Sequence, residues 1–276
     1  MKIIDFDVHF TDVLNRWIEE NSGRFRRPED MEDEVPDVYL RWLNTPADWL
    51  EGCTPGAYFE RFSDGAELCG LLCGYIRKEV PVPDPLLDRL GELGDEAALL
   101  ALAKDKSAPC EARMDAIELL RQLESTLPMV DFIRWQAERD DEEDILDNAL
   151  ESLRQMGEGV RAPAKVAFLA ADEAGKEALL DVLADYPGDD EVFHFALERF
   201  KTTKDKRALY AGYLAKLDDD HALEALLDVA EGDDVTYTDF IEIRSAIERL
   251  GSEAPVRDWS GDPTYQAFKR LQRVKR

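Results

Sequence analysis

The chain has 276 residues, of which 45% are hydrophobic, and carries 61 acidic against 34 basic residues, for a net charge of −27. This hydrophobic content is enough to build a folded core and excludes a disordered acidic tail. The negative charge repels nucleic acid phosphates and anionic lipid headgroups, so we expect no nucleic acid and no membrane among its partners and favour a basic partner.

The N-terminal sequence and the cysteines indicate the cellular compartment in which the protein is expected. No run of about 18 apolar residues occurs, and the residues after Met1 lack the pattern of a signal peptide. The four cysteines, Cys53, Cys69, Cys73 and Cys110, follow no disulfide framework. We therefore expect a cytoplasmic protein with free thiols, and we expect Cys69 and Cys73 to be buried hydrophobes because no further Cys or nearby His completes a metal site.

Residues 1–62 differ from the rest of the chain because they hold ten of its 25 aromatic residues. Apolar spacing predicts an amphipathic helix through about Asn21, and a second helical stretch is expected from Pro28 to Leu43. Capping residues followed by proline at the first helical position predict two short helices, which begin at Pro46 and Pro55. We interpret the region as an aromatic-rich helical cap that closes one end of a repeat array. A ligand or peptide pocket is the alternative.

From Ser63 onward, apolar residues recur at the three- and four-residue intervals of amphipathic helices, as in Ile145, Ala149 and Leu153. After one shorter step, the second helices of the predicted hairpins start about 32 residues apart, which indicates stacked hairpins. Their predicted starts lie near Asp84, Pro109, Asp141, Glu173, Lys204 and Thr236. Turns rich in Asp precede several helices, where a carboxylate can cap free backbone N–H groups. Twelve helices are predicted, at about 64–79, 84–93, 95–105, 109–124, 127–139, 141–156, 161–171, 173–186, 189–201, 204–217, 220–230 and 236–250.

A repeated phrase resembles a HEAT-like repeat. The clearest copies are Leu90–Leu99 and Leu214–Leu223, and partial copies follow at Leu153–Glu158 and Ile247–Glu253. The resemblance implies an all-α fold, a right-handed α-α superhelix or solenoid over residues 63–253. Residues 1–62 would be its cap, and residues 254–276 a linker and a basic capping helix. HEAT-like arrays are commonly binding scaffolds and only occasionally enzymes, so the resemblance specifies no subfamily and no chemistry.

A last helix is predicted from Thr264 to about Arg276, and its end, from Lys269 onward, has five basic and no acidic residues. Such a tail could bind nucleic acid. Docking on the acidic body of the protein, or fraying into solvent, is the preferred interpretation.

Motifs for catalysis or metal binding are weak. Asp5, Asp7 and His9 superficially resemble the opening of an amidohydrolase, but three histidines and no strands do not build that site. The run Asp218–Asp220 lacks the central Gly and terminal Glu of a calcium loop, so helix capping explains it. We expect His194 to form surface ion pairs, and we predict no catalytic, cofactor or metal site.

The second helix of each hairpin would line the concave face, as the resemblance implies. Its polar positions predict an acidic ridge that changes sign toward the C-terminus, and a face with no partner is the alternative. We therefore favour a non-catalytic protein–protein interaction scaffold that binds a protein or peptide with a basic segment. The alternative function is an enzyme on a HEAT-like scaffold with a site near the N-terminal aromatic region. The ridge residues are Asp115, Glu118, Asp144, Asn148, Glu151, Glu177 and Asp181.

Overall fold

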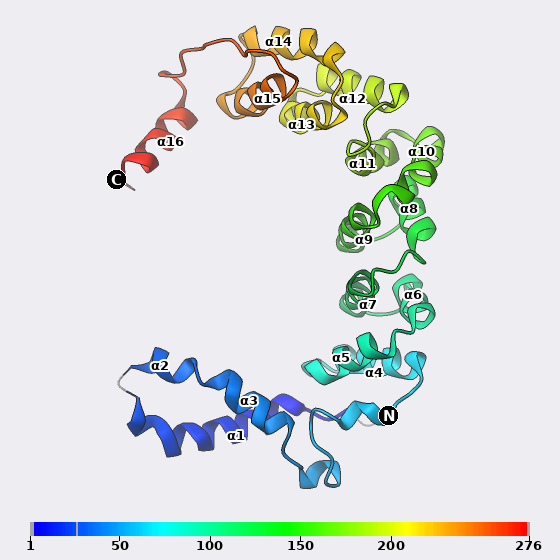
Figure 1. Cartoon of the computed structure of the whole chain (residues 1–276), viewed down its shortest axis with the longest axis vertical. Coiled ribbons are helices and arrows are strands. Elements are labelled where there is room, and N and C mark those ends of the chain that lie inside the picture. The colour runs from blue at the N-terminus through cyan, green and yellow to red at the C-terminus, as the bar shows by residue number, and fades with distance from the viewer. Residues whose placement is uncertain (1–2, 26, 275–276) are drawn as a thin grey trace. The chain divides into compact units, whose positions relative to one another are not determined.

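The computed structural model of the chain describes residues 3–25 and 27–274, and every regular element in these ranges is helical (Figure 1). The predicted all-α fold is therefore confirmed. None of the described helices combines the length and the apolar character that crossing a lipid bilayer requires.

The chain forms two compact units. The first contains the residues up to Phe132 together with Asp141–Met156, and the second contains Ile133–Asp140 together with the residues from Gly157 onward. Helix α8 (Met129–Glu138) begins in the first unit and ends in the second.

The first unit holds the aromatic N-terminal region and the first repeat hairpins. Three of its elements are short 3-10 turns, η1 (Ser22–Arg24), η2 (Asp48–Leu50) and η3 (Tyr58–Arg61). The capping residues and prolines predicted ordinary short helices where η2 and η3 lie. Its α-helices are α1 (Phe6–Asn21), α2 (Pro28–Glu32), α3 (Val35–Leu43), α4 (Gly65–Arg77), α5 (Asp84–Leu93), α6 (Glu96–Lys104), α7 (Cys110–Gln122) and α9 (Glu143–Gln155).

The second unit continues the hairpins and ends in the C-terminal helix. Its 3-10 turns are η4 (Gly157–Val160), η5 (Lys204–Lys206) and η6 (Asp220–Ala222). Its α-helices are α10 (Arg161–Ala170), α11 (Glu173–Leu183), α12 (Asp190–Thr202), α13 (Arg207–Leu217), α14 (Leu223–Glu231), α15 (Tyr237–Arg249) and α16 (Pro263–Val274).

All twelve helices predicted between residues 64 and 250 form, as α4 to α15, with ends that agree within about three residues. The acidic turns act as predicted in most places, since Asp95, Asp172 and Asp189 each accept a hydrogen bond from a backbone N–H in the first turn of the next helix. The turn before α15 differs because Thr236 is the cap. Asp234 instead forms ion pairs with Lys204 and with an arginine of α13.

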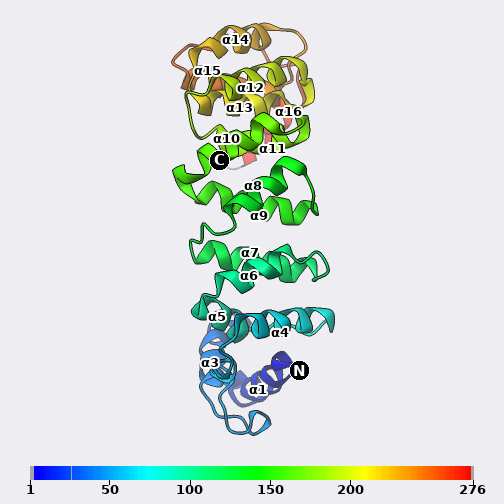
Figure 2. The same cartoon turned by 90° about the vertical axis from the view of Figure 1, so that its right-hand side faces the viewer.

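Within each unit, neighbouring helices pack side by side. Helix α7 packs on α6 and α9, and helix α13 packs on α12 and α15 (Figures 1 and 2). Fully buried Leu90, Ile117 and Leu153 belong to the core of the first unit, and Phe200 and Ile247 to that of the second. No isolated hairpin could bury these side chains, so each hairpin depends on the next one for its stability.

Basic side chains on one hairpin also reach Asp residues on the next. Arg113 of α7 donates two hydrogen bonds to Asp141, and Lys104 of α6 forms an ion pair with Asp131 at 2.7 Å. In the second unit Lys165 pairs with Asp189. These contacts fix the register between successive hairpins.

Helices α8 and α11 approach closely at Gly175, which predicts opposite effects for two Gly to Ala substitutions. A Cβ atom at Gly175 would lie 2.1 Å from the carbonyl oxygen of Ala137, whereas one at Gly70 of α4 has open space. We expect Gly175→Ala to lower the free energy of unfolding by about 1–3 kcal/mol through overpacking. Gly70→Ala should raise it by as much as ~1 kcal/mol through helix propensity. Urea denaturation measures both, and an increase for Gly175→Ala would contradict the close approach.

The N-terminal aromatic residues fill a core of their own between α1, α3, η2 and η3. Phe6 is buried, and its ring centroid lies 5.3 Å from that of Trp49 and 5.6 Å from that of Phe59. Arg89 of α5 donates hydrogen bonds to the carbonyl oxygen of Phe62, at 3.2 and 3.1 Å, which attaches this region to the first hairpin. The aromatic N-terminal region therefore packs as part of the first unit, against its first hairpin.

The C-terminal segment ends in the predicted basic helix. Asp262 caps α16, and the ring of Tyr265 in its first turn lies 5.1 Å from that of Tyr237 in α15. Lys275 and Arg276, which the sequence assigns to this helix, lie outside the described residues, as do the side chains of residues 272–274.

Candidate functional site

A groove of about 610 Å³ opens between α3, α5 and α7 in the first unit. It lies on the second-helix face, since α5 and α7 are the second helices of the first two hairpins. Five carboxylates line this acidic groove and none of its lining residues is basic: Asp84, Asp88, Glu92, Asp115 and Glu118.

The negative charge of the acidic groove is only partly compensated. Glu92 pairs with Arg89 and Glu118 pairs with Arg121. Asp88 and Asp115 have no ion-pair partner among the described residues. Their field therefore acts on whatever enters the groove.

Ionisation of the two unpaired carboxyl groups is opposed. Burial raises the pKa of Asp88, and the nearby Asp84 and Glu92 raise it further. Burial also raises the pKa of Asp115, as does Glu111 on the same helix. A cation placed beside either carboxylate would offset this effect and lower its pKa.

Apolar side chains form the rest of the groove wall. Leu40 of α3 is 56% exposed. Leu43, Leu87 and Leu119 lie beside it. Tyr39 donates a hydrogen bond to Asp84 at 3.1 Å, which ties α3 to α5 at the rim. The groove thus combines apolar contact area with uncompensated negative charge.

The structure brings five of the predicted ridge residues together on α7 and α9. Asp115 and Glu118 line the acidic groove. Asn148 accepts a hydrogen bond from Arg121 at 3.1 Å, and Arg154 pairs with Glu151 at 3.0 Å. Hydrogen bonds from Gln155 and Arg154 lower the pKa of Glu151. Asp144 is exposed at the start of α9.

The other two predicted ridge residues, Glu177 and Asp181 of α11, belong to the second unit. Glu177 pairs with Arg199 at 2.6 Å and with Lys206 at 2.7 Å. Burial alone would raise the pKa of Glu177, but hydrogen bonds, including the one from Lys206, lower it below the ordinary value. Asp181 accepts a hydrogen bond from Tyr213 at 2.8 Å. The charge of Glu177 is therefore compensated by ion pairs within the second unit.

A second hollow, of about 540 Å³, has mixed charge. It lies over α13 and α15, where Lys216 and Arg249 accompany Asp181 and Glu242. Lys216, Glu242 and Arg249 lie on helices for which the sequence predicted mixed charge. Its charges compensate one another, so it attracts neither sign strongly.

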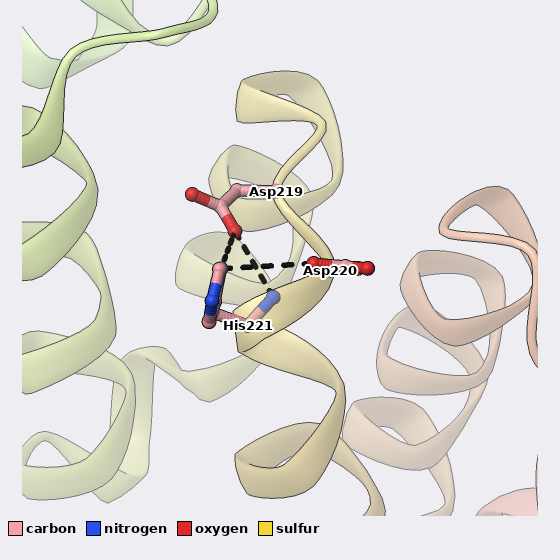
Figure 3. Close-up of side chains that lie close together, drawn as sticks. All are labelled: Asp219, Asp220 and His221. Carbon is pink, nitrogen blue, oxygen red and sulfur yellow. Dashed lines mark hydrogen bonds and ion pairs between the residues drawn. The ribbon is translucent and has the colours of Figure 1, made fainter.

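Three consecutive residues could present ligands to a metal ion, Asp219, Asp220 and His221 (Figure 3). Asp219 caps η6 and accepts hydrogen bonds from the backbone N–H and from Nδ1 of His221, at 3.0 and 2.7 Å. The hydrogen bond to Asp219 raises the pKa of His221, which favours the imidazolium form that cannot bind a metal. Asp219 thus acts as a helix cap, as the sequence predicted for this acidic run.

Two of the cysteines and the N-terminal aromatic rings contribute to the packing of the first unit. Cys69 and Cys73 are buried as predicted, and burial raises the pKa of Cys69 to about 12, so the thiol stays protonated. His9 stacks on Trp49 with the ring centroids 3.9 Å apart. The aromatic rings of this region pack against each other.

The acidic groove was not predicted from the sequence because its lining residues come from parts of the chain that were considered separately. Asp84 and Asp88 precede the region in which ridge positions were chosen, and Leu40 comes from the cap. The cations that compensate Glu177 also come from later helices. The available signal was the spacing of Asp84 and Asp88, because residues four positions apart on a helix lie on the same face.

Comparisons of the chain with protein-family models, with curated proteins and with solved structures found no match. The HEAT-like resemblance therefore rests on the repeated residues alone. Function has to be inferred from the geometry of the chain.

Proposed function

We propose that the chain is a non-catalytic protein–protein interaction scaffold, a HEAT-like right-handed solenoid whose second-helix face binds a basic, amphipathic segment of a protein partner. The observation that carries this proposal is the acidic groove, with five carboxylates, no basic lining residue and an exposed leucine. We place this activity in the cytoplasm, where the thiols remain reduced.

The partner segment has two chemical requirements. Its Lys or Arg residues would occupy the region near Asp88 and Asp115, which have no cation of their own. Its apolar side chains would cover Leu40 and the neighbouring leucines. Residues on one face of a helix, three and four positions apart, supply both kinds of group in the required proximity.

The ridge residues outside the groove have a secondary role in this proposal. Asp144 is exposed and Glu151 has a local arginine, so they would contact the ends of a bound segment. Glu177 and Asp181 belong to the second unit and are already engaged by Arg199 and Tyr213. Their removal should weaken binding less than removal of the unpaired carboxylates.

We expect the acidic groove to bind a basic amphipathic helix with an affinity that two neutral substitutions reduce. The probe is a synthetic peptide of about 15 residues with Leu on one face and Lys on the other. Asp88→Asn with Asp115→Asn should weaken probe binding about tenfold at a salt concentration of about 50 mM, as measured by fluorescence anisotropy. Raising the salt to about 500 mM should remove most of this difference.

The matched control changes two exposed carboxylates of the same unit outside the groove, Glu60→Gln with Glu67→Gln. It has the same effect on net charge and should leave the affinity within about twofold of the unmodified chain. Equal losses for the two double variants would mean that net charge, and not the acidic groove, attracts the probe.

The affinity should also depend on pH in a defined direction. Because the pKa values of Asp88 and Asp115 are raised in the free protein and a bound cation lowers them, binding releases protons. Affinity is therefore full at neutral pH and falls as the pH decreases through the raised pKa values. The Asn double variant should show a smaller dependence.

A further inference from the structure

The C-terminal helix α16 is itself a basic amphipathic helix with an uncovered apolar face. Phe268 is 52% exposed and Leu271 is 66% exposed, and they stand three residues apart, on one side of the helix. Lys269 and Arg270 lie between them, and no acidic residue follows Asp262 in the sequence. Large exposed apolar side chains beside basic ones are typical of a docking helix.

The structure holds α16 mainly by its first turn. Tyr265 packs against Tyr237, and the Gln266 side chain donates a hydrogen bond to the carbonyl oxygen of Ser260 at 2.7 Å. The ammonium of Lys269 lies 5.4 Å from the ring centroid of Tyr265. Within the described residues, neither Lys269 nor Arg270 forms an ion pair. The exposed Phe268 and Leu271 thus lie beyond the part of the helix that these contacts hold.

The acidic groove and α16 are complementary in charge and in apolar content. The groove has two unpaired carboxylates beside an exposed leucine, and the helix has unpaired cations beside an exposed Phe and Leu. We propose that α16 of one copy of the protein docks in the acidic groove of a second copy. This inference rests on the proposed function of the groove and names its occupant.

Such an interface joins two different surfaces, so it is heterologous. Each copy keeps one free groove or one free helix unless a ring closes, and association therefore continues beyond the dimer as concentration rises. The interaction depends on opposite charges at an exposed surface, so it weakens as salt increases.

The test uses the full chain and two matched variants in sedimentation velocity and equilibrium experiments. The groove variant is Asp88→Asn with Asp115→Asn, and the helix variant is Phe268→Ala with Leu271→Ala. Alanine keeps the helix propensity of α16. At about 50 mM salt, we expect the average mass of the unmodified chain to rise with concentration, and both variants to stay monomeric. Circular dichroism checks that they are folded.

The mixture of the two variants is the decisive sample. The groove variant retains an intact helix and the helix variant retains an intact groove, so together they can form one interface. We expect an equimolar mixture to yield a species of twice the monomer mass and nothing larger. A second helix variant, Lys269→Glu with Arg270→Glu, should behave like the first and guards against an effect of Ala on folding.

Three results overturn the inference: an unmodified chain that is monomeric at every concentration, self-association that persists in both variants, or a mixture that stays monomeric while the unmodified chain associates. The synthetic probe separates this inference from the proposed function. A groove that binds the probe in a chain that does not self-associate leaves the proposed function standing and removes α16 as its occupant. A groove that binds neither the probe nor α16 contradicts both the proposed function and this inference.

Discussion

Replacing Asp141 by Ala is expected to lower the free energy of unfolding by about 3–5 kcal/mol. The carboxylate forms a bidentate pair with Arg113, with oxygen to nitrogen distances of 2.9 and 2.6 Å, and only 3% and 1% of the two side chains are exposed. The Arg113 Nε–H also donates to the carbonyl oxygen of Ala103 at 2.9 Å. Removing the carboxylate leaves a buried guanidinium without its counterion.

The pKa of Asp141 is shifted in the opposite direction from those of Asp88 and Asp115. Burial opposes ionisation of Asp141, but the hydrogen bonds from Arg113 outweigh it and hold its pKa below the ordinary value. The pair therefore stabilises the fold fully above the pKa of an unfolded Asp, about 3.9, and this stabilisation is lost as the pH falls through the lower folded-state value.

Urea denaturation followed by circular dichroism measures the effect, with Asp147→Ala as the control. Asp147 is exposed on α9, so its replacement should change stability by less than about 0.5 kcal/mol. The double variant Arg113→Met with Asp141→Leu should recover most of the loss, because it removes both buried charges. A loss below ~1 kcal/mol for Asp141→Ala would show that the pair is solvated.

Replacing Trp42 by Ala is also expected to lower the free energy of unfolding by about 3–5 kcal/mol, because it removes a large side chain from a core. The side chain is 7% exposed, and its ring centroid lies 5.3 Å from that of Phe10 and 5.6 Å from that of Tyr39. Truncation would open a cavity between α1 and α3 that rigid rings cannot fill. The melting temperature should fall markedly.

Leu40 is the matched control because it lies on the same helix and faces the acidic groove. Leu40→Ala should change the melting temperature little and weaken probe binding, whereas Trp42→Ala should destabilise the fold. If Trp42→Ala melted like the unmodified chain, the ring would be a surface group, and a ligand site in the aromatic region would become the better interpretation.

The helices could be predicted from the sequence because their signals are local. Apolar spacing in α9, set by Ile145 and Leu153, and the cap of α12 at Asp189 both lie within or next to the helix that they determine. The short stretches at η2 and η3 were harder, since three or four residues after a proline do not distinguish a 3-10 turn from an α-helix.

The site was less predictable than the fold because its charges are compensated across helices. Glu177 and Asp88 are both carboxylates on second helices, and nothing local separates them. The difference arises from Arg199 and Lys206, which reach Glu177 from later elements, while no cation of the described residues forms an ion pair with Asp88. The contribution of Leu40 depends on the packing of the aromatic cap against α5, which no repeat pattern describes.

The most direct test of the central claim, that the acidic groove binds a basic amphipathic segment, is hydrogen–deuterium exchange of the full chain with and without the synthetic probe at low salt. We predict slower exchange in the segments that contain α3, α5 and α7, and unchanged exchange in α13 and α15 around the mixed-charge hollow. The protection should disappear in the Asp88→Asn, Asp115→Asn variant. Protection confined to α1, η2 and η3, or to the mixed-charge hollow, would contradict the claim.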